Sequence, residues 1–338
     1  MNGFHFQKAG VVKVFVTGGT GFTGSALSRA LAHQGRKVVA LDNKPGIFDD
    51  ELRELGVDIH IGSVTDEALV NRLADGCQRI YHLAAAFRLV NLGKKAYWNI
   101  NVGGTKNVLD AAKRGSGVRV VNCSTCGVHG NVENPPAAED APIEPADYYQ
   151  YTKWEGEKLA MQYVDQGLWV TTVRPAAIYG PGDPERFYLI FRRVARGSFT
   201  FLGNGSALYH PLYIDNLVDA MIQAGEAEGA NGQSYLIADE EFVPIRDLVA
   251  RTAKALNLPI KMRFLPFWPA YAVAAVVETA YAPFPAEPPI FRRRLDWFRQ
   301  NRAFDIRKAK KEIGYVPKVG LDEGLRRTGA WYRSRNMI

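Results

Sequence analysis

The first 175 residues alternate short runs of β-branched and apolar residues with segments of helical hydrophobic periodicity. This alternation is typical of βαβ units, because two parallel strands of one sheet must be joined by a crossover, usually a helix. We therefore predict an α/β fold with a doubly wound parallel sheet. The expected strands span residues 12–17, 37–42, 57–61, 79–83, 118–123 and 168–173, and the later expected helices span 98–114 and 149–166.

A glycine pattern of the form G-x-x-G-x-x-G follows the first expected strand and opens the first expected helix. Gly18 permits a tight turn, Gly21 lets backbone N–H groups approach a pyrophosphate, and Gly24 lets the helix pack close to the strand. Asp42 ends the second strand, where it can accept hydrogen bonds from ribose hydroxyls and would repel a 2′-phosphate. The pattern predicts a Rossmann-type site for NAD. Because Lys44 offsets part of the repulsion, NADP stays an alternative.

The alternation breaks after Arg174 into loops punctuated by glycine and proline, and one further strand is expected at 234–238. We predict a dinucleotide-binding domain over residues 1–175, which this strand rejoins. Residues 176–338 are expected to form a smaller, interleaved lobe that mainly binds substrate. A length of 338 residues suits two units of roughly 150 residues each.

A second motif, Y-x-x-x-K, places Tyr149 and Lys153 four residues apart in an expected helix. Residues i and i+4 share a helix face, so both side chains can point into one cleft. A nearby ammonium lowers the pKa of a phenol toward the range useful for general acid–base catalysis. Thr125 follows the fifth strand, at the edge where open α/β sheets bind ligands, and its hydroxyl can orient a substrate oxygen. Neighbouring Ser124 is the second hydroxyl at this edge.

Together these motifs resemble the extended short-chain dehydrogenase/reductase family, also called the NAD-dependent epimerase/dehydratase superfamily, over essentially the whole chain. The matching segments are 18–24, 81–85, 101–107, 124–130, 149–153 and 174–181. The resemblance implies a catalytic triad of Thr125, Tyr149 and Lys153, in which the lysine also holds the nicotinamide ribose. Ser63 stands where the family usually has Asp, and His129 replaces the usual tyrosine of a Val-Tyr-Gly motif. The implied cofactor contacts are Gly18, Gly21, Phe22, Thr23, Gly24, Asp42, Ser63, Val64, Leu83, Ala84, Ala85, Asn101, Tyr149, Lys153, Pro175 and Ile178.

Three departures narrow the branch within this resemblance. Nucleotide-sugar dehydratases carry an Asp-Glu pair where this chain has Cys126 and Gly127, so water elimination is not expected. Nucleotide-sugar epimerases commonly carry an Asn where this chain has Ala176 and Ala177. They also commonly carry an Arg near the position of Tyr209, where this chain has the sequence Tyr-His-Pro instead. The C-terminal half instead resembles the 3β-hydroxysteroid dehydrogenase branch, which includes sterol-4-carboxylate dehydrogenases and bacterial 3-oxoalkanoate reductases. The segments that carry this likeness are 180–184, 203–205, 213–217, 302–309 and 313–317.

We therefore predict an NAD(P)-dependent oxidoreductase that interconverts a secondary alcohol and a ketone on a largely apolar substrate, sterol-like or 3-oxoacyl. A nucleotide-sugar epimerase with retained NAD is the alternative, and a non-enzymatic, cofactor-sensing protein is a third. The expected partner is a small-molecule substrate, and neither nucleic acid nor a metal is expected. The family resemblance also implies a homodimer.

One segment stands apart by its composition: residues 264–286 carry a single charge, Glu278, and four prolines. The uninterrupted helical part, 270–282, is shorter than the roughly 20 residues that a membrane span needs. We interpret it as a buried helix of the small lobe; the alternative is an apolar lid or a membrane-surface helix. The adjacent basic run 292–294 supports this second alternative, which is peripheral membrane contact through 264–294.

The positive charge is concentrated near the C-terminus. The chain carries a net +7, but residues 288–338 alone carry +9, so the remainder carries −2. We interpret this basic segment as a solvated surface; the alternative is a basic collar beside an apolar entrance, facing an anionic membrane or an acidic group of the substrate. Three cysteines and an N-terminus without a signal-peptide core predict a cytoplasmic location, with membrane association as the alternative.

Overall fold

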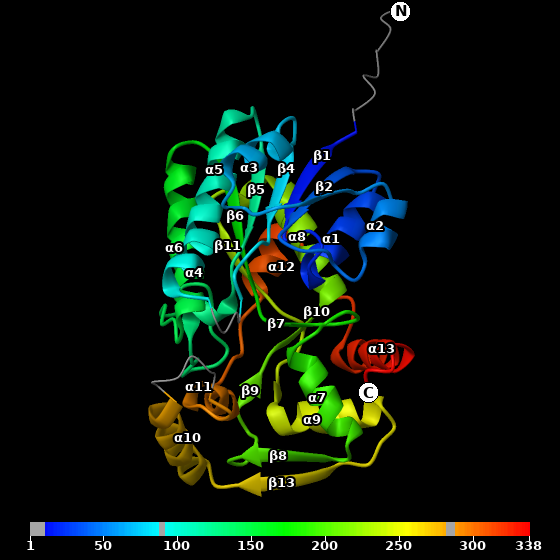
Figure 1. Ribbon diagram of the computed structural model, residues 1–338, viewed down its shortest axis with the longest axis vertical. Coiled ribbons are helices and arrows are strands. Elements are labelled where there is room, and N and C mark those ends of the chain that lie inside the picture. The colour runs from blue at the N-terminus through cyan, green and yellow to red at the C-terminus, as the bar shows by residue number, and fades with distance from the viewer. Residues whose placement is uncertain (1–10, 88–91, 282–287) are drawn as a thin grey trace, which may run out of the picture.

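The computed structural model describes residues 11–87, 92–281 and 288–338, and its centre is a seven-stranded parallel sheet (Figure 1). The strands are β1 (Lys13–Thr17), β2 (Lys37–Asp42), β3 (Asp58–Ile61), β4 (Arg79–His82), β5 (Arg119–Cys123), β6 (Trp169–Pro175) and β11 (Ser234–Ile237). Their order across the sheet is β11-β6-β5-β4-β1-β2-β3, and every neighbouring pair is parallel. The chain leaves β1 in one direction for β2 and β3 and then crosses to β4, so the switch point lies between β1 and β4. The predicted doubly wound α/β fold is confirmed.

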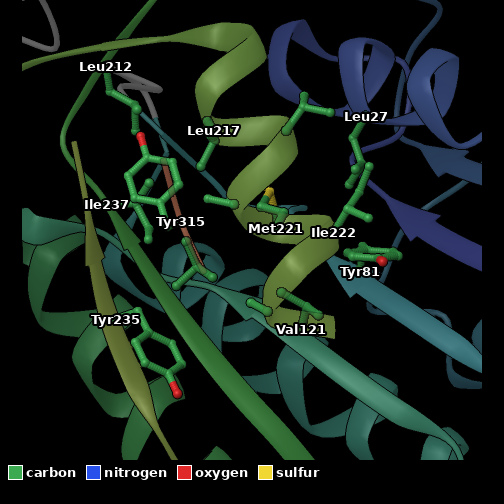
Figure 2. Close-up of a cluster of buried hydrophobic side chains, with 14 of the residues drawn as sticks. Leu27, Tyr81, Val121, Leu212, Leu217, Met221, Ile222, Tyr235, Ile237 and Tyr315 are labelled. Carbon is green, nitrogen blue, oxygen red and sulfur yellow. The ribbon is translucent and has the colours of Figure 1, made fainter. Parts of the chain in front are cut away.

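Helices cover both faces of this sheet, because strand residues alternate between the faces. Val14 and Val16 enter one core cluster, whereas Phe15 enters another on the opposite face. The first face is covered by α1 (Phe22–His33), α2 (Asp49–Glu54), α8 (Ile214–Glu226) and α12 (Arg307–Ile313). The second is covered by α3 (Glu67–Ala74), α5 (Gly104–Arg114) and α6 (Tyr148–Asp165). Figure 2 shows Leu217 and Met221 of α8 packed among side chains from the strands and α1.

The helix expected at 98–114 starts earlier and is not uniform. It consists of α4 (Lys94–Trp98), a π-helical turn (Asn99–Gly103) and α5, which follow one another without a break. A π-turn inserts one extra residue into a helix, and such turns occur frequently at functional sites. Asn101 lies within this turn, and its side chain is buried.

The remaining elements form three small two-stranded sheets and further helices around a third core cluster. The pairs are β7 (Ala177–Tyr179) with β10 (Pro211–Tyr213), β9 (Leu208–Tyr209) with β12 (Val243–Pro244), and β8 (Ser198–Leu202) with β13 (Lys261–Leu265). The helices are α7 (Arg186–Ala195), α9 (Ile245–Ala255), α10 (Phe267–Tyr281), α11 (Arg292–Leu295) and α13 (Leu321–Ser334). Because α8, β11 and α12 pack on the large sheet, the chain passes repeatedly between these two parts (Figure 1).

The interpretation of the apolar segment as a buried helix is wrong. Among the residues of α10 only Ala274 is buried, while the side chains of Trp268 and Val276 are 68% and 69% exposed. The helix also starts at Phe267, because Pro269 lies in its first turn, where a missing N–H costs no hydrogen bond. The end of the segment, residues 282–286, lies outside the described residues. None of the helices in the described ranges has the length and apolar character needed to cross a bilayer.

Candidate active site

The residues predicted to form the site follow the carboxyl ends of successive strands. The glycine loop follows β1, Asp42 ends β2, residues 63–64 follow β3, residues 83–85 follow β4, Thr125 follows β5, and Pro175 ends β6. Since these strands are parallel, their carboxyl ends meet at one edge of the sheet. Of the predicted residues, Ile178 alone lies in a small sheet, in β7.

The glycine loop is packed against the backbone at two of its three glycines. Gly18 has a φ of 70°, and a Cβ atom placed there would lie 2.8 Å from the backbone nitrogen of Ala84. A Cβ on Gly24 would lie 1.8 Å from the carbonyl oxygen of Gly18. Gly21 is less crowded, and it is the N-cap of α1, whose first turn has no acidic residue. The N–H groups of Phe22 and Thr23 at this helix N-terminus are therefore able to receive an anion.

The Asp42 carboxylate holds this loop in place. Its Oδ2 accepts hydrogen bonds from the backbone N–H groups of Thr20 (3.2 Å) and Gly21 (3.1 Å), and its Oδ1 accepts one from Asn43 (2.8 Å). A carboxylate has about four acceptor positions, so positions remain for ribose hydroxyls. The open glycine, the uncapped helix N-terminus and the partly exposed carboxylate together fit an adenine dinucleotide.

The loop after β3, which carries the predicted cofactor contacts Ser63 and Val64, is also fixed by hydrogen bonds. The Ser63 and Thr65 hydroxyls lie 2.8 Å apart, and Val64 is buried against Gly104 of α5. The Asn107 side chain donates to the Val64 carbonyl at 2.9 Å. The loop after β3 therefore sits on the N-terminal part of α5.

Asn101 connects the loop after β4 with α6. Its Oδ1 accepts the N–H of Ala86 at 2.7 Å, and its Nδ2 donates to the Thr152 hydroxyl at 2.8 Å. The Thr105 hydroxyl donates to the Asn101 carbonyl at 2.6 Å, within the π-helical region. The buried amide thus fixes α6 one residue before Lys153.

Tyr149 and Lys153 lie one turn apart near the start of α6. The helix is capped by Asp147, whose side chain accepts the N–H of Gln150 at 2.8 Å. Tyr149 is partly exposed, and its ring meets the edge of Phe87 at a centroid distance of 4.9 Å. The Lys153 ammonium is buried, and this burial lowers its pKa, while the negative charge of Glu157 acts in the opposite direction.

The two hydroxyls after β5 have different surroundings. Ser124 is buried and donates its hydrogen bond to Glu157 of α6. Thr125 is partly exposed, and its Oγ1 accepts the N–H of Gly127 (3.1 Å), which caps the 3₁₀ turn Cys126–His129. Because this oxygen acts as an acceptor there, its proton remains available for a ligand oxygen.

Sequence reasoning missed a buried polar network behind these residues. The Arg174 guanidinium and the Glu157 carboxylate form an ion pair at 2.8 Å, with side chains only 6% and 3% exposed. Arg174 also lies 3.1 Å from Nε2 of His129. Since arginine can only donate, Nε2 must be the acceptor, and Nδ1–H donates to the carbonyls of residues 141 and 142. Burial and the Arg174 charge lower the pKa of His129, so it is a neutral structural residue.

One signal for this network was present in the sequence. Glu157 lies one turn beyond Lys153 on the same face of α6, so a carboxylate was to be expected near the lysine. Its partner Arg174 comes from β6, and no local pattern connects the two residues.

Known proteins match this chain over most of its length. Residues 14–238 match the NAD dependent epimerase/dehydratase family. The chain is 31% identical over 332 residues to a 2-alkyl-3-oxoalkanoate reductase of Stenotrophomonas maltophilia, covering 94% of this chain and 99% of that protein. It is 27% identical over 331 residues to the decarboxylating sterol-4-alpha-carboxylate 3-dehydrogenase of Mus musculus, covering 94% and 90%. The solved structure of MoeE5 in complex with UDP-glucose and NAD superimposes with a TM-score of 0.76 at 25% identity, covering 96% and 99% of the two chains.

The family match spans the whole of the sheet described above, from β1 to β11, and therefore includes every strand that carries a predicted site residue. Structures of this fold hold NAD. The chain therefore belongs to the NAD dependent epimerase/dehydratase family and is an NAD-dependent oxidoreductase.

Proposed function

We propose that the protein interconverts a secondary alcohol and a ketone on a largely apolar substrate, with Tyr149 as the general acid–base residue. When bound, NAD supplies the acceptor or donor of the hydride. Gly18, Gly21 and the N-terminus of α1 would hold its pyrophosphate, and Asp42 would hold the adenosine ribose.

The protein's own residues move and hold the proton. The Tyr149 phenolate accepts the proton of the alcohol in the oxidising direction, and the phenol returns it in the reducing direction. Thr125 donates a hydrogen bond to the same substrate oxygen. Lys153 stabilises the phenolate by its charge, and the Asn101–Thr152 hydrogen bond positions this part of α6.

The observation that carries this proposal is the burial of an ammonium beside a partly exposed phenol. Lys153 is 3% exposed, and Tyr149 lies one helical turn before it on the same face of α6. Burying an ammonium group costs free energy, because burial penalises the charged form. Stabilisation of the Tyr149 phenolate would give this buried positive charge a catalytic role.

The substrate class is supported by two observations. The relatives described above act, by their names, on 2-alkyl-3-oxoalkanoates and on a sterol carboxylate. Ala176 and Ala177, which follow Arg174, offer only methyl groups, and both are buried. A nucleotide diphosphate would find no side-chain donor at these two positions, which disfavours a nucleotide-sugar substrate.

The first test replaces the phenol. Tyr149→Phe is expected to lower kcat by about 10²–10⁴-fold, the typical contribution of a general acid–base group, while the Kd for NADH stays within about threefold of wild type. Tyr151→Phe is the matched control: Tyr151 lies on the same helix but is exposed, and residue 155 is Glu rather than Lys. Activity would be followed by nicotinamide absorbance. Appreciable turnover by Tyr149→Phe would remove Tyr149 from the mechanism.

A substrate panel separates the proposed reaction from epimerisation. Sterols with a 3-hydroxyl group, 3-oxoacyl compounds and nucleotide sugars would each be incubated with enzyme and cofactor. We expect net oxidation or reduction of the cofactor with a member of the first two groups. Copurified NAD together with sugar epimerisation and no net NADH would contradict the proposal.

A further inference from the structure

We propose that the outer face of α10, together with the adjoining end of β13, binds the surface of an anionic lipid membrane. The outer face is defined by Trp268, Ala272, Val273, Val276 and Ala280, and the adjoining strand end by Phe264 and Leu265. This surface lies at the end of the molecule opposite α3 and α5, beside α11 (Figure 1). The proposal is independent of the substrate assigned above.

The outer face is apolar and exposed at the same time. Trp268, Ala272, Val276 and Ala280 are spaced by four residues, so they form one stripe along the helix, and all four are exposed. The hydroxyl of Thr279, beside this stripe, donates to the carbonyl of Ala275 in its own helix at 2.9 Å, so it is satisfied internally. A helix that is apolar all round is normally buried. This one is covered on one side only.

Exposed apolar side chains continue from the helix into β13. Phe264 and Leu265 are 51% and 52% exposed. Exposed apolar side chains that are grouped in this way mark an interaction site rather than ordinary solvent-facing structure. Trp and Phe are also residues that insert at the boundary between lipid headgroups and acyl chains.

The charge around this surface identifies the occupant. Residues 261–299 contain six basic and three acidic residues. Within the described part of this segment, Arg292 and Arg293 pair with Glu278 and Asp147, whereas no carboxylate pairs with Lys261, Arg263 or Arg294. Cations that have no carboxylate partner among the described residues, beside an apolar stripe, match anionic headgroups above an acyl layer.

Arg294 adds to a local excess of positive charge. Burial and then the Arg294 charge lower the pKa of Arg193 in α7, which places two cations near each other at this end of the molecule. Such mutual repulsion is relieved when an anion approaches both groups. A second copy of this chain would bring the same positive charge, so self-association through this face is disfavoured.

The surface is connected to the catalytic helix. Arg293 of α11 forms a 2.7 Å ion pair with Asp147, the N-cap of α6 and two residues before Tyr149. The inner side of α10 contributes Phe267 to a pocket of about 270 Å³ with a mixed lining, which includes apolar Leu202 and Phe298 and polar Asn204, Ser206, Arg299 and Asn301. A membrane bound to the outer face would therefore lie near this pocket and near the N-terminus of α6.

The test is vesicle sedimentation of the full-length protein at low and high salt, with phosphatidylcholine vesicles and with vesicles containing 30 mol% phosphatidylglycerol. We expect at least tenfold stronger partitioning onto the anionic vesicles, weakened by salt. The double variant Val273→Ser/Val276→Ser is expected to lose about tenfold or more of this binding. Val11→Ser/Val316→Ser is the control, because these valines are similarly exposed (69% and 61%) but lie elsewhere.

The charge contribution is tested separately. Arg263→Gln/Arg294→Gln should weaken binding to the anionic vesicles by about tenfold to thirtyfold and leave binding to neutral vesicles unchanged. Lys37→Gln/Lys254→Gln, at two exposed lysines outside the surface, should have little effect. Absence of binding to either vesicle type, or binding unaffected by the α10 variant, would overturn the proposal. A dimer that only the α10 variant converts to monomer would also overturn it, by assigning the face to a second copy.

Discussion

Substitution of Gly24 by alanine tests the architecture of the cofactor loop. The added Cβ would lie 1.8 Å from the Gly18 carbonyl oxygen and 2.8 Å from the Gly19 Cα, whereas real Cβ contacts are almost never shorter than 3.0 Å. The start of α1 must therefore move by at least 1.2 Å relative to the loop. The obstructing atoms belong to the backbone, so no side-chain rotation can relieve the overlap.

The magnitude follows from what this movement disrupts. Overpacking of this kind costs about 1–3 kcal/mol of stability. Helix propensity alone would favour alanine over glycine by about 1 kcal/mol, so the two effects have opposite signs. A displacement larger than 1 Å would also remove about two charge-assisted hydrogen bonds from the pyrophosphate, each worth about 1.5–3 kcal/mol. We expect the Kd for NADH to rise by about 10²–10⁴-fold.

The assay is calorimetric titration with NADH, accompanied by denaturant unfolding. Gly229→Ala is the matched control, because a Cβ there has no atom within 4 Å and its φ is not in the left-handed region. This control should bind NADH as the wild type does. Binding by Gly24→Ala within threefold of wild type would refute the argument that close packing of α1 on the loop shapes the pyrophosphate site.

Three further predictions follow from buried or shared carboxylates. Glu157→Gln leaves the Arg174 charge buried without a counter-ion, so its free energy of unfolding in denaturant should be lower by about 3–5 kcal/mol. A decrease below about 1 kcal/mol would contradict this expectation. Asp42→Ser removes the repulsion of a 2′-phosphate, so the ratio of kcat/KM for NADPH over NADH should rise at least tenfold; an unchanged ratio would reassign Asp42 to loop structure alone. Burial raises the pKa of Asp239 to about 7, so the folded state binds a proton that the unfolded state releases near pH 4. Stability from this group is therefore present at low pH and lost as the pH rises to about 7. In urea unfolding, the free energy of unfolding of the wild type should fall by about 2–3 kcal/mol between pH 5 and 7 relative to Asp239→Asn. Parallel pH profiles of the two proteins would exclude this titration.

Local sequence patterns predicted the parts of the molecule that depend on short-range geometry. The strand at 37–42 agrees with β2 residue for residue, and the strand expected at 234–238 rejoins the sheet, where it pairs with β6. Helical spacing alone placed Tyr149 and Lys153 on one face of α6. These features depend on the side-chain periods of strands (two residues) and helices (3.6 residues). Residues close together in the sequence specify these periods, without contacts to distant parts of the chain.

Long-range contacts decided the rest. The ion pair between Glu157 and Arg174 joins α6 to β6. The same network supports the prediction of Thr125 rather than Ser124, because Glu157 accepts the serine hydroxyl. Asp42 has a second role as acceptor for the glycine loop, which a ribose-binding pattern does not reveal.

The apolar segment shows this division most clearly. Its sequence established a helix too short to span a bilayer, interrupted by prolines and nearly free of charge. Because apolar residues occur on every side of α10, its sequence has no single apolar stripe. The sequence therefore could not indicate which side of the helix packs against the rest of the protein. Only the tertiary structure, which packs α10 at the end of the molecule with Val276 and Trp268 exposed, determined that one face is left for solvent or a partner.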